Sequence, residues 1–154
     1  MKTVPSSKHL ESRLAAFTDE VWSSGRIDRC AEYVAAAYTI DHDPGDPWDG
    51  KTLDLEGYID RVRRSRAPFP DQKFHIREMI SDKNRVVMTW LWTATHAGDY
   101  PGFPATGQPL TMSGATMYYF NDDEKLTGHW QITDRLGVYQ QLQRSKSAAR
   151  ESPG

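Results

Sequence analysis

The chain has 154 residues, a formal net charge of −2, 26% charged residues and 38% hydrophobic residues. This length favours one domain built on one core and leaves no room for a second. The balanced charge argues against a nucleic-acid-binding or membrane-binding surface. No stretch approaches the roughly 18 apolar residues that a membrane span needs. We therefore expect a soluble globular protein whose partners include neither nucleic acid nor membrane.

Cysteine usage points to a reducing compartment. Cys30 is the only cysteine, so the chain forms no internal disulfide, and no Cys or His stands near it at metal-ligand spacing. The N-terminal stretch lacks the apolar core of a signal peptide. We expect a cytoplasmic protein without a metal site.

The first predicted element is an amphipathic helix over residues 12–23. Leu14, Phe17 and Val21 recur at three- and four-residue spacing and so share one face. Gly25 ends this helix.

Two further helices and a loop are expected before the strands. The spacing of apolar residues predicts a second helix over 27–37, and the turn formers that follow predict a loop over 38–50. A third helix begins near Leu55 and must stop before Pro68. Its basic cluster, residues 61–66, is interpreted as a solvated helix face, with phosphate binding as the alternative.

From residue 72 onward the hydrophobic period changes from that of a helix to that of a strand. β-Branched and aromatic residues predict four strands, Gln72–Ile80, Arg85–His96, Leu110–Phe120 and Leu126–Ile132. Residues 121–124 resemble a hairpin turn, and the Pro- and Gly-rich residues 98–107 a longer loop. A short amphipathic helix is expected at 135–142, and residues 145–154 are expected to fray.

Helices followed by a meander of antiparallel strands predict an α+β fold, in which helices pack on one face of a curved sheet and the sheet encloses a cavity. We expect a single domain over residues 12–143. Residues 1–11 would be an N-terminal extension and residues 144–154 a flexible tail.

Six motifs in order resemble the SnoaL-like polyketide cyclases over roughly residues 12–143. They are Val21-Trp22-Ser-Ser-Gly25, Asp41-His42-Asp43-Pro44, Phe69-Pro70-Asp71, Thr95-His96-Ala97-Gly98, Pro104-Ala105-Thr106-Gly107 and the segment from His129-Trp130 to Gln141-Leu142. The resemblance implies a cone-shaped barrel, a curved antiparallel sheet wrapped around the N-terminal helices, and a homodimer or homotetramer. It also implies an enzyme without a cofactor, although this fold hosts binding modules as well.

The last strand supplies the first candidate residues. Side chains alternate across a strand, so His129 and Gln131 share one face and Trp130 and Ile132 the other. His129 is either a proton-transfer group or a histidine hydrogen-bonded at the cavity rim. The resemblance implies an aspartate acid/base at the position of Gln131, whose amide has no accessible pKa. Gln131 is therefore expected only to orient a water or carbonyl.

Other candidates lie at the ends of strands and helices. Asp134 is interpreted as the N-cap of the last helix, with catalysis as the alternative. The resemblance places His96 near the mouth of the pocket. Trp90 lies on the same face of the predicted strand as His96, and it is part of the sheet core, of a subunit interface or of a substrate platform. His42 lies between Asp41 and Asp43. It is either a base that these carboxylates activate or part of a loop cluster that hydrogen-bonds its own backbone. The catalytic candidates are His42, His96, His129, Gln131 and Asp134, and the substrate-binding candidates are Asp43, Trp90, Met112, Thr116, Tyr118 and Phe120.

These features predict an acid/base cyclase or isomerase that acts on a hydrophobic polyketide-like or carbonyl metabolite. Two alternatives stay open, namely epoxide opening on the same fold and a member that binds a small molecule without catalysis.

Overall fold

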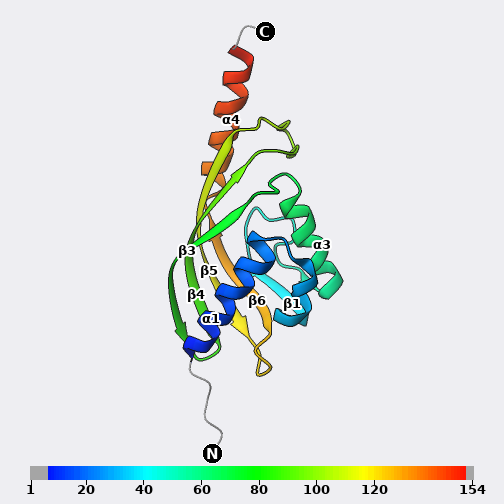
Figure 1. The fold of residues 1–154 in the computed structure, drawn as a ribbon, viewed down its shortest axis with the longest axis vertical. Coiled ribbons are helices and arrows are strands. Elements are labelled where there is room, and N and C mark those ends of the chain that lie inside the picture. Colours follow the sequence, from blue (N-terminus) through cyan, green and yellow to red (C-terminus); the bar gives the residue numbers. More distant parts are fainter. Residues whose placement is uncertain (1–6, 152–154) are drawn as a thin grey trace, which may run out of the picture.

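The computed structural model describes residues 7–151, with side chains described for residues 7–148. Helices α1 (Ser7–Phe17) and α3 (Leu55–Arg66) cover the concave face of a six-stranded sheet, and α4 (Arg135–Glu151) leaves its far end (Figure 1). Shorter helical segments are η1 (Thr18–Ser23), η2 (Ile27–Arg29) and α2 (Cys30–Tyr33). The strands are β1 (Val34–His42), β2 (Thr52–Leu53), β3 (Lys73–Asp82), β4 (Arg85–Thr95), β5 (Pro109–Phe120) and β6 (Leu126–Thr133).

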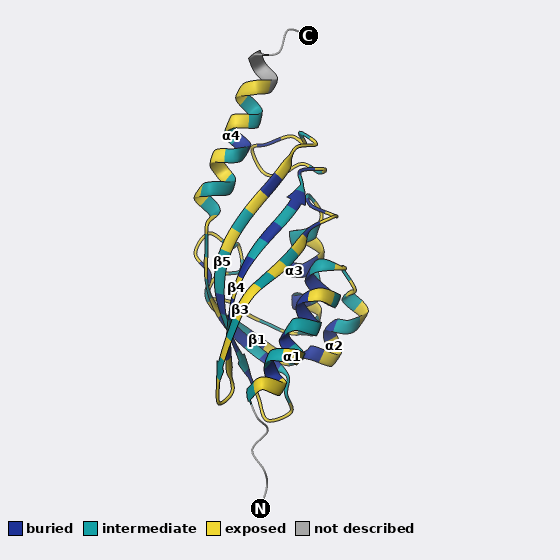
Figure 2. Cartoon of the chain, turned by 60° about the vertical axis from the view of Figure 1, so that its left-hand side comes forward, coloured by how far each residue is buried: buried dark blue, intermediate teal, exposed yellow. Residues whose placement is uncertain are grey.

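The sheet has the order β2-β1-β6-β5-β4-β3 and remains open between its two edge strands. The expected α+β cone is confirmed, with one refinement, because β1 runs parallel to β6 while every other neighbouring pair is antiparallel. Buried residues alternate with intermediate or exposed ones along β4, as expected for a sheet with one covered face (Figure 2). The four strands predicted after residue 72 are thus confirmed.

The core lies between the helices and the concave face. Leu10, Leu14 and Phe17 of α1 are buried, and Val21 and Trp22 of η1 continue the same apolar stripe. The first predicted helix therefore exists, but it begins before residue 12, because residues 7–11 form the first part of α1. Residues 1–6 lie outside the described residues.

The predicted helix over 27–37 is correct only as far as Tyr33, and the predicted loop over 38–50 is correct only from residue 43 onward. Helical structure ends at Tyr33, and β1 runs from Val34 to His42. Val34, Tyr38 and Ile40 are buried, and their side chains fill the core between the sheet and α3. Burial and pairing with β6 on one side and β2 on the other outweigh the helix propensity of the three alanines at 35–37.

The terminal helix is longer than expected. α4 continues to Glu151, so residues 145–151 are helical rather than frayed, and residues 152–154 lie outside the described residues. Asp134 accepts the backbone N–H of Gly137 through Oδ1 at 2.9 Å, which confirms its interpretation as the N-cap. No helix among residues 7–151 is long and apolar enough to cross a membrane.

Gly128 allows the parallel pair to form. It lies opposite Thr39, and a Cβ added to Gly128 would stand 2.5 Å from the backbone oxygen of Thr39. We expect Gly128→Ala to force β1 away from β6 and to lower the free energy of unfolding by about 1–3 kcal/mol, the usual cost of overpacking. Urea denaturation measures this loss. An unchanged midpoint would show that the strands separate without cost.

Candidate active site

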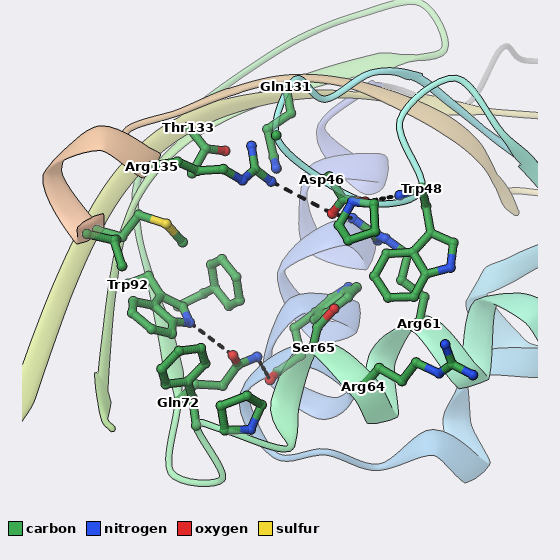
Figure 3. Close-up of a pocket in the computed structure, with 18 of the residues that line it drawn as sticks. Asp46, Trp48, Arg61, Arg64, Ser65, Gln72, Trp92, Gln131, Thr133 and Arg135 are labelled. Atoms are coloured by element: carbon green, nitrogen blue, oxygen red, sulfur yellow. Dashed lines mark hydrogen bonds and ion pairs between the residues drawn. The ribbon is translucent and has the colours of Figure 1, made fainter. Parts of the chain in front are cut away.

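A cavity of about 700 Å³ lies between the concave face of the sheet, α3, the start of α4 and the loop after β1. Its walls are largely apolar and aromatic, and they include Trp22, Phe69, Phe74, Trp90, Trp92 and Met112. At one end the lining becomes polar, with Asp46, Arg61, His129, Gln131 and Arg135. Figure 3 shows Asp46, Arg61, Gln131 and Arg135 grouped at this end, away from Trp92 and Gln72. The cavity thus offers one polar end to a mainly apolar ligand.

The polar end is organised around the carboxylate of Asp43, which is fully buried. Its Oδ2 accepts hydrogen bonds from Nε2 of His129 at 3.0 Å and from Nε2 of Gln131 at 3.1 Å. Arg61 donates to the same oxygen from Nη2 at 3.4 Å. Nη2 of Arg135 lies 2.9 Å from Oδ1 as an ion pair, but Oδ1 receives no aligned hydrogen bond.

Asp43 is ionised in this setting. Burial by itself would raise the pKa of its carboxyl group, but the hydrogen bond from His129 and the charge on Arg135 outweigh burial. The pKa of Asp43 is therefore lowered from its ordinary value. A buried anion held in this way can accept a proton.

His129 is neutral and has a defined tautomer. Burial lowers the pKa of its imidazole, and the hydrogen bond to Asp43 offsets only part of that effect. Nδ1 of His129 lies 2.7 Å from the hydroxyl of Tyr38, and burial keeps the pKa of that phenol well above its ordinary value. Tyr38 therefore donates to Nδ1, and the Nε2 proton of His129 points to Asp43.

These shifts predict that stability falls as the solution becomes acidic. The folded pKa of His129 is below the ordinary value of 6.5, so the unfolded chain takes up this proton first and stability declines below about pH 7. The stabilisation from Asp43 is complete above the ordinary value of 3.8 and is lost as pH falls through its lowered folded pKa. In urea titrations, His129→Gln should flatten the decline between about pH 7 and 5. His75→Gln, which alters an exposed histidine, should not, and equal slopes in the two variants would contradict this assignment.

Gln131 is held by a hydrogen-bonded chain that runs across the sheet. Trp90 donates from Nε1 to Oγ1 of Thr116 at 2.9 Å, and Thr116 donates to Oε1 of Gln131 at 2.6 Å. A Cβ on Gly114 would lie 2.4 Å from Cζ2 of Trp90, so this glycine makes room for the indole. These two hydrogen bonds fix the side-chain amide of Gln131 so that its N–H points toward Asp43.

Two arginines neutralise the two carboxylates at the polar end. Arg61 lies 3.2 Å from Oδ2 of Asp46, and Arg135 lies 3.7 Å from the same oxygen. Burial lowers the pKa of Arg61, but Asp46 and the other neighbouring groups raise it above the ordinary value. With His129 neutral, the two negative and two positive charges balance.

Some of the predicted residues meet at this site. His129 and Gln131 share the inner face of β6, as predicted, and both reach Asp43. Trp90, Met112 and Tyr118 line the cavity, and Thr116 supports Gln131 from behind. Burial raises the pKa of Tyr118, so its hydroxyl stays protonated.

Other predicted residues lie elsewhere. His42 stacks on Trp130, with ring centroids 4.7 Å apart, and neither lines the cavity. Asp41-His42-Asp43 was predicted to lie in a loop, but Asp41 and His42 belong to β1. His96 is buried beneath the loop after β4, where Nδ1 contacts Oγ1 of Thr106 at 3.1 Å. Phe120 is a buried core residue, and Asp134 caps α4.

The sequence interpretation missed Asp46, Arg61, Thr133 and Arg135, which line the cavity. Arg61 was assigned to a solvated basic face, yet it is buried, while Arg63 and Arg64 of the same cluster are exposed. Its place on the apolar side of α3, next to buried Val62 and one turn from buried Tyr58, was a usable signal. Among residues 7–151, no group of three or more His, Cys, Asp or Glu side chains could hold a metal ion.

Solved structures share this architecture. A candidate polyketide cyclase from Acidithiobacillus ferrooxidans is 56% identical, with a TM-score of 0.85 over 94% of this chain and 99% of the other. IdmH, a candidate polyketide cyclase from Streptomyces antibioticus, is 25% identical, with a TM-score of 0.73 over 87% and 98%. AclR from Streptomyces galilaeus, a candidate hydroxylase, shares the fold at 16% identity, with a TM-score of 0.74 over 90% and 98%.

A search of curated proteins found no significant match. The family model of the SnoaL-like polyketide cyclases matches residues 12–142, which include every strand and the residues of the polar end. The match confirms the resemblance in the six motifs. The chain therefore belongs to the SnoaL-like polyketide cyclase family.

Proposed function

We propose that this protein is a cofactor-independent acid/base enzyme, a cyclase or isomerase that acts on a hydrophobic polyketide-like or carbonyl metabolite. One observation carries the proposal, namely the ionised, fully buried Asp43, which lies directly behind His129 and Gln131 at the polar end of an aromatic cavity. Asp43, rather than Gln131, is the proposed base. His129 and Gln131 hold its carboxylate in place through hydrogen bonds of 3.0 and 3.1 Å.

The cavity suits such a substrate in size and surface. A volume of about 700 Å³ lies within the range of roughly 300–1,000 Å³ that is usual for small-molecule sites. Trp22, Trp90 and Trp92 offer flat apolar surface to a planar or folded carbon skeleton. The charged groups Asp46 and Arg61 lie together with Arg135 at one end, so a bound molecule would place its polar group there.

The proposed reaction begins when Asp43 removes a proton from a carbon next to a carbonyl group. The electron pair of the broken C–H bond forms the enolate, and Asp43 becomes a neutral acid. In a cyclase, the enolate carbon attacks a second carbonyl of the same molecule and the new alkoxide takes the proton back from Asp43. In an isomerase, the proton returns to a different carbon.

The proposal can be tested by hydrogen exchange, which needs no complete cyclisation. Apolar aryl 1,3-diketones and β-keto esters are incubated with the protein in D₂O, and mass spectrometry follows deuterium at the carbon between the carbonyl groups. We expect the wild-type protein to accelerate exchange above the buffer rate, and a fitting substrate to give a cyclised or isomerised product. Saturable binding of these compounds with exchange only at the buffer rate would favour a non-catalytic binding protein.

Epoxide opening is the second candidate, favoured by the contact of 3.1 Å between Gln131 and Asp43, which could hold a water beside a carboxylate. That reaction also needs an acid for the epoxide oxygen, and Asp43, whose pKa is lowered, is ionised and has no proton to donate. In H₂¹⁸O, a diol that carries one labelled oxygen, formed from an epoxide substrate, would identify this reaction, and epoxides recovered without a labelled diol would count against opening by water.

A further inference from the structure

Arg135 stands where the local structure disfavours a cation. It is the first residue of α4, a helix of 17 residues with no acidic residue in its first turn. The positive end of the helix dipole opposes a positive side chain at this position. A residue that is unfavourable in its own helix or strand, with no compensating local contact, often has a role in a binding or catalytic site.

The contacts of Arg135 explain its position. Nη1 donates to the backbone oxygen of Pro44 at 2.7 Å, and Nη2 lies 2.9 Å from Oδ1 of Asp43. The side chain is 32% exposed and lines the cavity. Its guanidinium therefore touches both the proposed base and the space that a substrate would fill.

Thr133 lies beside it with an unused hydroxyl. Thr133 follows His129 and Gln131 at two-residue spacing on β6, and it lines the cavity with them. Its Oγ1 is buried and has no hydrogen-bond partner, which is costly for a polar group unless a ligand or water completes it. Figure 3 shows Thr133 next to Arg135 at the polar end of the cavity.

We propose that Arg135 and Thr133 form the subsite that binds the reacting carbonyl oxygen and holds its negative charge. This inference rests on the proposed function, with Asp43 as the base. Proton transfer makes Asp43 neutral and places the charge on the enolate oxygen. The guanidinium of Arg135 then loses the carboxylate of Asp43 as an anionic partner and gains the enolate oxygen. It therefore pairs with a negative charge both before and after proton transfer.

The subsite narrows the substrate class. The ligand it fits is a planar enolate or phenolate whose oxygen reaches Arg135 while its carbon skeleton lies against the aromatic walls. A carbonyl flanked by a second carbonyl or an aromatic ring gives such an anion, because its charge is delocalised onto the oxygen. An isolated ester or amide carbonyl fits the site less well.

An equilibrium experiment tests this subsite without turnover. Asp43→Asn imitates the protonated base, so it removes the nearer of the two anionic partners of Arg135 and leaves only Asp46 at 3.7 Å. The probe is 2-naphthol, whose absorbance and fluorescence distinguish phenol from phenolate. We expect Asp43→Asn to bind the phenolate roughly tenfold or more tightly than wild type, on the usual strength of a hydrogen bond to a charged group. The apparent pKa of the bound probe should fall accordingly.

Matched variants decide whether Arg135 causes the gain. In the Asp43→Asn background, Arg135→Gln should abolish it, Arg135→Lys should keep part of it, and Thr133→Val should reduce it several-fold. Arg63→Gln is the control, because Arg63 is exposed on α3 and does not line the cavity. Thermal unfolding confirms that each variant is folded. Arg135→Gln and Arg135→Lys in the otherwise wild-type chain provide a second measurement, in which both should lower kcat for exchange more than they raise KM.

Two outcomes would overturn the proposal. A folded Asp43→Asn protein that binds the phenolate no more tightly than wild type would do so, as would a gain that survives Arg135→Gln. Phenolate binding that depends on Arg135, in a protein that exchanges no carbonyl compound, would support the subsite and reject the proposed enzymatic function.

Discussion

Asp43→Asn should lower carbonyl-dependent deuterium exchange and product formation at least a hundredfold while the fold stays intact. Asn has nearly the same shape as Asp, and its oxygen can still accept from His129 and Gln131. It has no basic site for a proton from carbon, and general base catalysis usually contributes about 10²–10⁴ in rate. Initial rates measured at saturating substrate separate this loss in kcat from weaker binding.

The chain supplies a matched control two residues away. Asp41 is exposed on β1, and Asp41→Asn makes the same chemical change and the same change in net charge. It should leave the rate within about twofold, because a surface charge has little effect on a buried site. If the two variants lose activity equally, or if Asp43→Asn retains the wild-type rate, Asp43 is not the base.

Arg61→Met should reduce the free energy of unfolding by about 3–5 kcal/mol, the usual cost of breaking a buried charge network. Arg61 is buried, lies 3.2 Å from Oδ2 of Asp46 and 3.4 Å from Oδ2 of Asp43, and places its guanidinium 5.1 Å from the ring centroid of Trp22. Methionine keeps much of the packing volume, so the loss isolates the charge. Urea denaturation at pH 7 measures it.

Arg64→Met provides the comparison on the same helix. Arg64 is 70% exposed and pairs with Asp60, a contact that contributes about 1 kcal/mol or less. A cost for Arg61→Met as small as that for Arg64→Met would show that the buried carboxylates find other partners. The destabilisation from Arg61→Met should also shrink at low pH, where protonation of Asp43 removes uncompensated negative charge.

The C-terminal half of the chain was predictable because its signals are local. Alternation along β6 correctly placed His129 and Gln131 on the inner face and exposed Trp130 and Ile132. Asp134 was recognised as a cap because a cap is read from its position before a helix. Where the hydrophobic period and the turn-forming residues indicate the same element, the sequence alone predicts which face each side chain occupies.

The N-terminal half was not predictable in the same way. Residues 34–42 form a strand because β6 and β2 flank them, and neither partner is visible in the local pattern. The error concealed the alternation that brings Tyr38 to His129. Asp43 was predicted only to contact the substrate, because no local signal in the sequence shows that it lies 3.0 Å from a histidine on the last strand.

The charged residues were missed for another reason. Arg61 was grouped with neighbouring arginines because sequence reports charge, whereas burial depends on which side of α3 faces the sheet. Arg135 and Asp46 come from a helix terminus and a loop, and only the folded chain brings them together. A paired buried charge has no signature in a single sequence until its partner is known.

The parallel pairing of β1 with β6 has a consequence for how the protein is made. Asp43 and His129 are 86 residues apart in sequence, so their contact forms only after the intervening helix and four strands have been synthesised. Long-range closure of this kind is slow in folding. On a ribosome, β1 must remain without its principal neighbour until β6 emerges, and the proposed base cannot reach its ionised, hydrogen-bonded state before then. Activity should therefore be among the last properties that a newly made chain acquires.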